Sequence, residues 1–222
     1  MKKIFEKIVR YVSFVSILAF VGSCDKKEYE GWDSPYVCVE SYIPYYVVPN
    51  SLMLNESWNY NFEPGFVLKI KGIDIVQNKD SDKDQYNALA KKYGDVGYNS
   101  KAPIGREGAI SVAIDSISVV SDTDIDTLHS KGTELSDIVM LNTRSYYLFV
   151  KSGYKDTNDQ YTDKDKFISE YTKEDLTLLF NRHGLGFHFD SAKVIKGTHN
   201  LTITIYFEDG KILSTTQTLK FE

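Results

Sequence analysis

Hydrophobic and polar residues alternate with a period of two along much of the chain. The clearest run lies at the carboxyl terminus, where every second residue is apolar: Leu201, Ile203, Ile205 and Phe207. Asp209-Gly210 follows, and a second β-prone run ends at Phe221. An Asp-Gly pair between two such runs is typical of a type I′ turn, which requires positive φ at both central residues. The pattern predicts a hairpin that pairs Leu201–Glu208 with Lys211–Phe221, and the apolar side chains of the first strand form a main core face.

Further alternating or apolar runs predict more strands: Tyr36–Tyr42, Phe66–Val76, Ala109–Val120, Ser145–Lys151 and Gly186–Asp190. Gly72 lies inside the second of these, where a glycine marks a bend or a bulge. Within Ala109–Val120 the apolar positions change face after Ile114, because Ile117 and Val119 are displaced by one residue. This displacement predicts a β-bulge near Asp115-Ser116.

Helical patterns are few. After Thr172, a predicted N-cap, Asp175 can close a capping box, and an apolar stripe continues to Phe180 before Gly184 ends the helix. A weaker pattern predicts a helix over Gln85–Lys92, and Leu135–Leu141 fits either a helix or a strand. Many strands with one or two helices predict a mostly β fold, an antiparallel β-sandwich that is Ig-like or related.

The amino terminus has the pattern of an export signal. Residues 1–10 carry four basic side chains and one acidic side chain, and residues 11–21 carry no charge. Eleven residues suit the apolar part of a signal peptide but are too short to cross a bilayer, which requires about 20. Val21-Gly22-Ser23-Cys24 resembles the lipobox of bacterial lipoproteins. We therefore expect residues 1–23 to be removed and the Cys24 thiol, a strong nucleophile, to receive the lipid. An unmodified Cys24 after simple secretion is the alternative.

A lipidated Cys24 predicts a membrane anchor, because two or more acyl chains such as palmitate hold a protein stably at a bilayer. Residues 24–34 are mostly polar or charged and are expected to form a tether, followed by one β-rich domain over residues 35–222. Acidic residues soon after Cys24 resemble the surface-export signal of Bacteroidetes-type lipoproteins, although Lys26 and Lys27 interrupt them. We expect an outer membrane lipoprotein, and both the cell surface and the periplasmic face remain open.

Composition narrows the classes of partner. The 222 residues include 26 basic and 31 acidic side chains, and their formal net charge is −5. Removing residues 1–23 takes away three net positive charges and leaves −8. An acidic chain without a basic block argues against nucleic acid as a partner. With 42% hydrophobic residues the chain can bury a sizeable core. Cys38 would be the one thiol besides Cys24, which leaves no intramolecular disulfide.

From about Ala88 onward the chain resembles an uncharacterised family of Bacteroidetes lipoproteins, defined by a domain of unknown function. The resemblance rests on these residues: Ile114-Asp115-Ser116-Ile117-Ser118-Val119, Ser121-Asp122-x-Asp124-x-Asp126, His129, Gly132-Thr133 and Leu135-Ser136-Asp137. It implies an outer membrane location and supplies no activity.

Two groups of residues are candidate metal ligands. Asp122, Asp124 and Asp126 have the spacing that begins a calcium loop, but Thr127 and Thr133 occupy the positions where an EF-hand needs Gly and Glu. The three carboxylates are therefore candidates for a looser site that binds a hard cation, and a solvated loop is the alternative.

His183, His188 and Asp190 form the second group. Gly184 and Gly186 exclude a helical His pair, but in a strand His188 and Asp190 would share one face. Such a set could hold a metal with open positions, and ordinary surface and core histidines are the alternative.

Aromatic residues are the best binding candidates. Tyr45, Tyr46, Trp58 and Tyr60 lie close together in the sequence and could form a sugar-stacking or protein-docking surface, or simply core aromatics. The sequence contains no zinc-protease, serine-elbow, phosphate-loop or dinucleotide motif, so no cofactor is expected. We expect a lipid-anchored binding or interaction module with a glycan or protein ligand. The alternatives are a small carbohydrate-active hydrolase, with paired carboxylates in an aromatic cleft, and a pilin-like structural subunit.

Overall fold

The computed structural model describes residues 39–55, 64–98, 104–155, 160–189 and 194–221. The predicted signal peptide, Cys24, the tether and Cys38 lie outside these ranges. The chain divides into two compact units, one of residues 1–40 with 99–103 and one of residues 41–98 with 104–222. Only Val39 and Glu40 of the first unit are described, so the fold below is that of the second unit.

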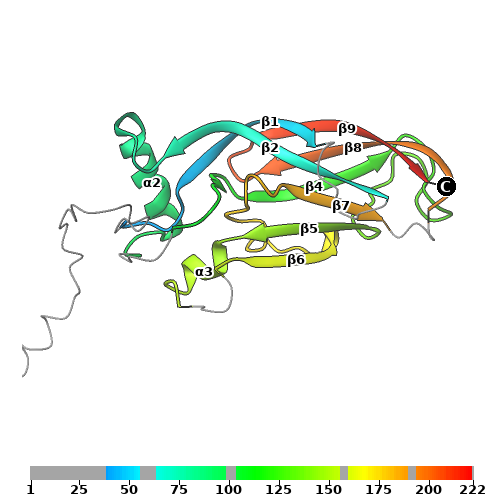
Figure 1. The fold of residues 1–222 in the computed structure, drawn as a ribbon. Helices are drawn as coiled ribbons and strands as arrows, with labels where there is room; N and C mark the ends of the chain where they lie inside the picture. Colours follow the sequence, from blue (N-terminus) through cyan, green and yellow to red (C-terminus); the bar gives the residue numbers. More distant parts are fainter. Residues whose placement is uncertain (1–38, 56–63, 99–103, 156–159, 190–193, 222) are drawn as a thin grey trace, which may run out of the picture. The chain divides into compact units, whose positions relative to one another are not determined.

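The second unit is mostly β and contains two sheets (Figure 1). The six-stranded sheet has the order β3-β1-β2-β7-β5-β6 and the three-stranded sheet the order β4-β8-β9. The strands of the larger sheet are β1 (Tyr45–Asn55), β2 (Gly65–Val76), β3 (Ala109–Ile110), β5 (Val139–Ser145), β6 (Thr162–Phe167) and β7 (Leu185–Phe189). Those of the smaller sheet are β4 (Ile114–Ser121), β8 (Gly197–Phe207) and β9 (Ile212–Phe221). Among the described strands, neighbours pair antiparallel except β1 and β3, which pair parallel over two residues.

The main core lies between the two sheets. From β8, the four predicted apolar side chains are all buried, and β5 and β7 contribute Leu141 and Phe187 to the same cluster. Burying such side chains from water is the principal stabilising contribution. The structure confirms the prediction of a mostly β, sandwich-like fold with short helices.

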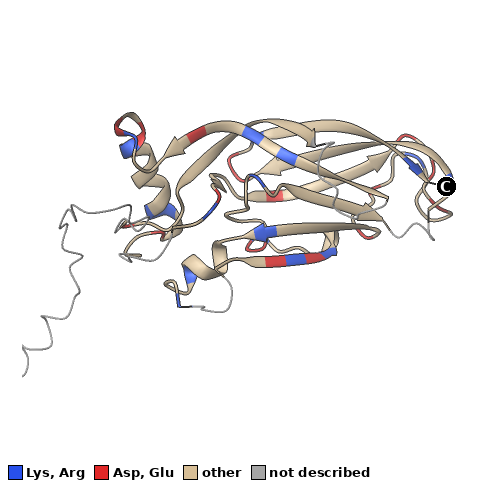
Figure 2. Ribbon diagram, viewed as in Figure 1, with Lys and Arg blue, Asp and Glu red and all other residues tan. Residues whose placement is uncertain are grey.

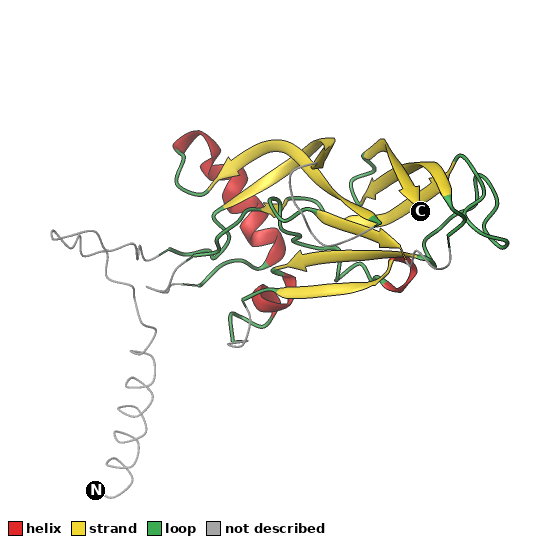
Figure 3. Ribbon diagram, turned by 45° about the vertical axis from the view of Figure 1, so that its right-hand side comes forward, coloured by secondary structure: helices red, strands yellow, loops and turns green. Residues whose placement is uncertain are grey.

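Two α-helices lie toward one end of the strands (Figure 3). They are α2 (Lys83–Tyr93), which follows the 3₁₀ turn η1 (Asp80–Asp82), and α3 (Tyr147–Lys151). A second 3₁₀ turn, η2 (Ile168–Glu170), follows β6. The buried face of α2 presents Tyr86 and Ala90, and these pack with Tyr46 of β1 in a second cluster. The helix confirms the weaker of the two helix predictions.

Both predicted irregularities in the strands are present. Gly72 pairs with Pro49, and the β1–β2 register shifts between Pro49 and Ser51. A Cβ at Gly72 would lie 1.8 Å from the carbonyl oxygen of Val48, so only glycine fits this close approach. In β4 the register shifts at Asp115, which confirms the predicted bulge.

The predicted helix after Thr172 is wrong. The capping contacts exist, since the backbone N–H of Thr172 donates to Asp175 at 3.0 Å, but the chain continues as turns. Leu178 has a φ of +51°, which ends any helix at this point. Leu179 and Phe180 then form isolated bridges with Ser145 and Ala109 and pack into different clusters. Leu179 and Phe180 therefore belong to an extended segment whose side chains pack into the two hydrophobic clusters, and not to the apolar face of a helix.

The predicted strand Ser145–Lys151 is also wrong, because β5 ends at Ser145 and α3 follows. The Ser145 hydroxyl accepts a hydrogen bond from the backbone N–H of Tyr147 at 3.0 Å, and the N–H of Val150 bonds to the carbonyl of Tyr146 at 3.0 Å. The bond from the Tyr147 N–H to the Ser145 hydroxyl forms a serine turn just before α3, whose N-cap residue, Tyr146, makes no side-chain capping bond. No strand covers the described part of Tyr36–Tyr42, and β1 lies in a segment for which the sequence predicted no strand.

The carboxyl-terminal hairpin is confirmed, but its turn is not type I′. The N–H of Gly210 bonds to the carbonyl of Phe207, and the N–H of Phe207 bonds to the carbonyl of Lys211, each at 2.9 Å. Gly210 has a φ of +83°, whereas Asp209 is not among the residues with positive φ. This is a three-residue loop, a type I turn closed by a glycine bulge.

Candidate functional site

The carboxylates of the first predicted metal group are used as hydrogen-bond acceptors within the protein. Asp122 accepts hydrogen bonds from the backbone N–H and the side-chain amide of Asn200 at 2.9 and 2.7 Å. Asp124 accepts from the backbone N–H of Lys131 at 2.7 Å. Asp122 thus binds β8 and Asp124 binds its own loop, so the two carboxylates do not converge on one point.

Asp126 holds His129. The ring Nδ1 of His129 lies 2.8 Å from both carboxylate oxygens of Asp126, and Nε2 lies 3.1 Å from Asp137. The hydrogen bond with Asp126 raises the pKa of His129 above its usual 6.5. Throughout the described ranges, no three His, Cys, Asp or Glu side chains form a group that could hold a metal ion. The structure therefore does not support the cation site at Asp122, Asp124 and Asp126.

The second metal group is not assembled either. His183 is buried and its Nε2 lies 3.3 Å from the amide oxygen of Asn142, and burial together with nearby Arg144 lowers its pKa to about 4. His188 instead pairs with Asp165 at 2.7 Å. Asp190, the third predicted member, lies outside the described residues.

The two described residues of the predicted aromatic surface, Tyr45 and Tyr46, do not support it. Tyr46 is completely buried in the second cluster. Tyr45 is half-buried against the main core, and its ring fills the space where a Cβ of Gly108 would lie. Both are core aromatics, which was the alternative interpretation. Trp58 and Tyr60 lie outside the described residues.

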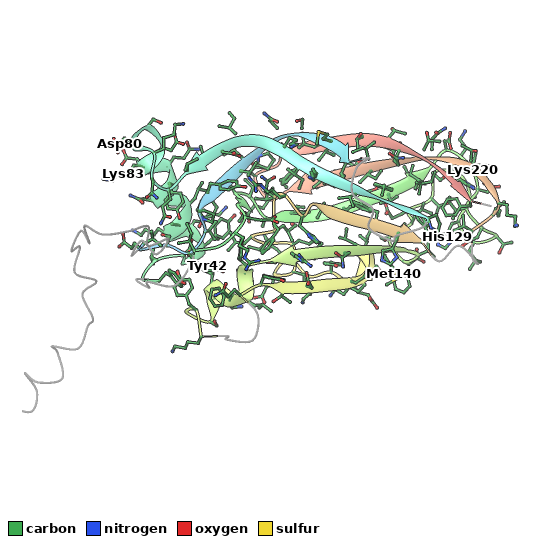
Figure 4. The ribbon with its side chains drawn as sticks, in the orientation of Figure 1. Tyr42, Asp80, Lys83, His129, Met140 and Lys220 are labelled. Carbon is green, nitrogen blue, oxygen red and sulfur yellow. The ribbon has the colours of Figure 1, made fainter. Side chains whose placement is uncertain are left out.

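Asp95 is a buried carboxylate that the sequence did not reveal. It has no exposed surface and accepts hydrogen bonds from the N–H groups of Tyr42 and Ile43 at 2.8 and 3.0 Å. The phenols of Tyr46 and Tyr154 donate to it at 3.2 and 2.9 Å. Burial raises the pKa of Asp95. Figure 4 shows Tyr42 near the end of the strands where α2 lies and His129 toward the other end, so the two polar centres are separate.

A groove of about 340 Å³ lies near the same helices. It is lined by the carboxyl end of α2, by α3, by the residue before β4, by the turn that follows η2 and by the residue after β8: Lys92, Tyr93, Ala113, Tyr147, Lys151, Lys173, Glu174, Thr177 and Glu208. Figure 2 shows basic residues on both α2 and α3. Three lysines and two glutamates give the lining one net positive charge.

The charged side chains of the groove are paired. The carboxylate of Glu208 accepts from Lys92 at 2.5 Å and lies 3.3 Å from Lys173. The hydrogen bond with Lys92 lowers the pKa of Glu208. Lys151 contacts Glu174 at 2.6 Å, and all three lysine side chains remain about half exposed. They can therefore turn toward a ligand.

Two tyrosines form apolar walls. The hydroxyl of Tyr93 donates to the carbonyl of Ser111 at 2.8 Å, which fixes the ring at the end of α2. The ammonium of Lys92 lies 4.8 Å from the centre of this ring, and that of Lys151 lies 5.3 Å from the centre of the Tyr147 ring. Aromatic rings beside cations suit ligands that combine an apolar face with polar groups.

The turn that carries Lys173 and Glu174 is held by Asp175. This buried carboxylate accepts from Lys166 at 2.9 Å and also from Lys164, and these lysines belong to β6. Although burial by itself would raise the pKa of Asp175, the hydrogen bonds from these lysines and from Thr172 hold it well below its usual range. The capping pattern seen in the sequence thus anchors a turn of the groove.

The sequence did not predict the groove, because the residues that line it come from five separate segments.

No protein-family model matches the chain, and no curated protein or solved structure matches it. Among the helices of the described residues, none has both the length and the hydropathy needed to cross a membrane.

Proposed function

We propose that the chain is a lipid-anchored binding module of the bacterial outer membrane, and that the groove is where it binds a ligand. The anchor rests on the sequence pattern that ends at Cys24. The family resemblance supports the same location. The folded unit supplies two β-sheets that can support a binding surface.

The groove carries the proposal. Its volume of about 340 Å³ lies at the lower end of the range of roughly 300–1,000 Å³ that is usual for small-ligand sites. Two tyrosine rings line its walls, of which Tyr93 is fixed by a hydrogen bond to Ser111, and its rim has half-exposed lysines beside carboxylates. Such a combination of an apolar floor and oriented polar groups is typical of recognition sites.

The same groove allows a test of the hydrolase alternative, because it contains two carboxylates and two aromatic rings. A glycosidase needs one carboxylic acid whose pKa is raised, so that it can protonate the leaving group. The pKa of Glu208 is instead lowered by Lys92, and Glu174 is paired with Lys151. The geometry therefore favours binding over hydrolysis.

A pilin-like role would require a strand that can be exchanged between subunits. The last strand, β9, is fully paired with β8 and contributes Leu219 and Phe221 to the main core. Removing it would open that core, so this alternative receives less support than binding.

The experiment is a binding screen with the lipidated protein purified in detergent, against glycans and peptides. Lys173→Glu places a negative charge on the rim, and Lys83→Glu makes the same change at an exposed position at the other end of α2. A ligand that is bound by the wild type and the Lys83 variant but lost by the Lys173 variant supports the proposal. Equal binding by all three proteins would place the ligand elsewhere, and release of shortened glycans would favour the hydrolase.

A further inference from the structure

We propose that the ligand of this groove is a saccharide that carries a carboxylate, such as a uronic acid or a sialic acid unit. This inference rests on the proposed binding function and deepens it by naming the class of ligand.

The carboxylate is assigned by the charges at Glu208. Lys92 and Lys173 both contact this single glutamate, so one of the two ammonium charges has no matching negative charge there. Their side chains are 45% and 58% exposed, and a second carboxylate can therefore reach them from the solvent. Ammonium–carboxylate hydrogen bonds are about twice as strong as neutral ones.

We infer the sugar ring from the apolar lining of the groove and from the remaining polar groups on its rim. Tyr93, Tyr147 and Ala113 give the groove an apolar lining against which the C–H face of a pyranose can pack. Each sugar hydroxyl both donates and accepts hydrogen bonds. Glu174 can accept from such hydroxyls and Lys151 can donate to them, so a rim that mixes both charges suits a polyol.

An acidic peptide fits the groove less well. A peptide with several acidic side chains would place more than one carboxylate beside Glu174 and Glu208, which is unfavourable, whereas one uronic or sialic acid unit places a single carboxylate beside the lysines. The lining also comes from helix ends and turns, which offer an extended peptide no strand edge to pair with.

The test uses isothermal titration of the lipidated protein in detergent with a panel of acidic oligosaccharides. The panel contains oligomers of galacturonic, glucuronic and mannuronic acid and sialylated oligosaccharides, and each is matched with its methyl ester. The ester keeps the shape and removes the charge. We expect at least one acid to bind about ten-fold or more tightly than its ester, and this preference to shrink as the salt concentration rises.

Two variants locate the carboxylate. Lys173→Gln should weaken binding of the acid about five-fold or more and leave binding of the ester unchanged, and Lys83→Gln should change neither. If esters bind as well as acids and Lys173→Glu abolishes both, the groove is a binding site but the acidic class is wrong. If poly-glutamate binds and no saccharide does, the ligand is an acidic peptide.

A third result would overturn both proposals together. In that case no member of the panel binds at about 1 mM, and every ligand found in the wider screen binds the wild type and Lys173→Glu equally.

Discussion

Replacing Asp95 with alanine should destabilise the domain strongly, although the residue lies in no predicted motif. Its carboxylate accepts from two peptide N–H groups and two phenols, and Asp95 itself has no exposed surface. Alanine removes the acceptor and leaves the donors in place. The segment most affected is Tyr42–Ile43, which is held to the helix end by these bonds.

The size of the stability loss depends on which hydrogen-bond donors are left without an acceptor in the variant. The hydroxyls of Tyr46 and Tyr154 can rotate toward other acceptors, but the N–H groups of Tyr42 and Ile43 are fixed in the backbone. Each buried donor left unsatisfied costs about 1–3 kcal/mol, so the two together cost about 2–6 kcal/mol. Losing a buried carboxylate offsets part of this cost, since burial alone disfavours its charged form. We expect a net loss of about 2–4 kcal/mol in the free energy of unfolding.

Urea denaturation followed by far-ultraviolet circular dichroism measures this loss, provided that the slope with urea stays the same. Asp74→Ala is the matched control, because Asp74 is exposed on β2 and should change stability by less than about 0.5 kcal/mol. The change in stability with pH provides a second test of the role of Asp95. A raised acid pKa gives stability that is complete below the unfolded pKa, here 3.8, and is lost as the pH rises through the folded pKa. The difference between wild type and Asp95→Ala should therefore shrink from about pH 4 toward neutral pH. Equal stability of wild type and Asp95→Ala at pH 4 would refute the assignment.

Three further predictions address the anchor, the hairpin and the His129 cluster. Cys24→Ser should abolish incorporation of labelled fatty acid, and equal labelling of both proteins would contradict the lipid anchor. Gly210→Val should cost roughly 1–3 kcal/mol in urea melts because Gly210 has a φ of +83°, and Gly210→Asn should cost much less; equal costs would show that the backbone conformation is not the cause. The pKa of His129 is raised, so its stabilising contact with Asp126 is complete below pH 6.5 and is lost as the pH rises through the folded pKa. His129→Gln should remove this decline, and an unchanged pH profile in the variant would count against it.

The elements predicted well were those in which one periodicity acted alone. The alternation from Leu201 to Phe207 became β8 with those side chains buried, and the predicted bulge near Asp115-Ser116 is present. The single strand predicted over Ala109–Val120 is wrong, because this segment forms β3 in the larger sheet and most of β4 in the smaller one. The turn between β8 and β9 was harder to predict. An Asp-Gly pair is compatible with a two-residue loop and also with the last two positions of a three-residue loop. In the structure, the hydrogen bond from the N–H of Phe207 to the carbonyl of Lys211 shows that the loop has three residues.

The errors occurred where a short polar contact overrides the pattern. The Ser145 hydroxyl accepts from the N–H of Tyr147, the first residue of α3, and this local bond turns the backbone where the pattern predicted a strand. The reciprocal contacts of Thr172 and Asp175 look the same in a sequence whether a helix follows or not. Here Leu178 has positive φ and the chain extends instead, so that its neighbours reach both hydrophobic clusters.

The candidate site could not be predicted for a related reason. Lys92, Lys173 and Glu208 are far apart in the sequence, and each lies in a segment whose own pattern concerns a helix, a turn or a hairpin. Only the packing of these segments brings them together. Asp95 was missed because a lone aspartate next to a helix-ending glycine looks like an ordinary solvated turn residue.

The net charge of the whole chain and the local charge of the groove favour different partners. The net charge of −5 opposes long-range attraction of a polyanion such as nucleic acid, because charges of the whole surface contribute at that range. Within the groove, lysine and ligand are separated by less than the screening length of about 8 Å, so the local balance dominates. That balance is a single excess positive charge, which one carboxylate neutralises and a row of phosphates would exceed. A groove with one excess positive charge therefore favours a ligand unit that carries a single carboxylate over a densely charged polyanion such as nucleic acid.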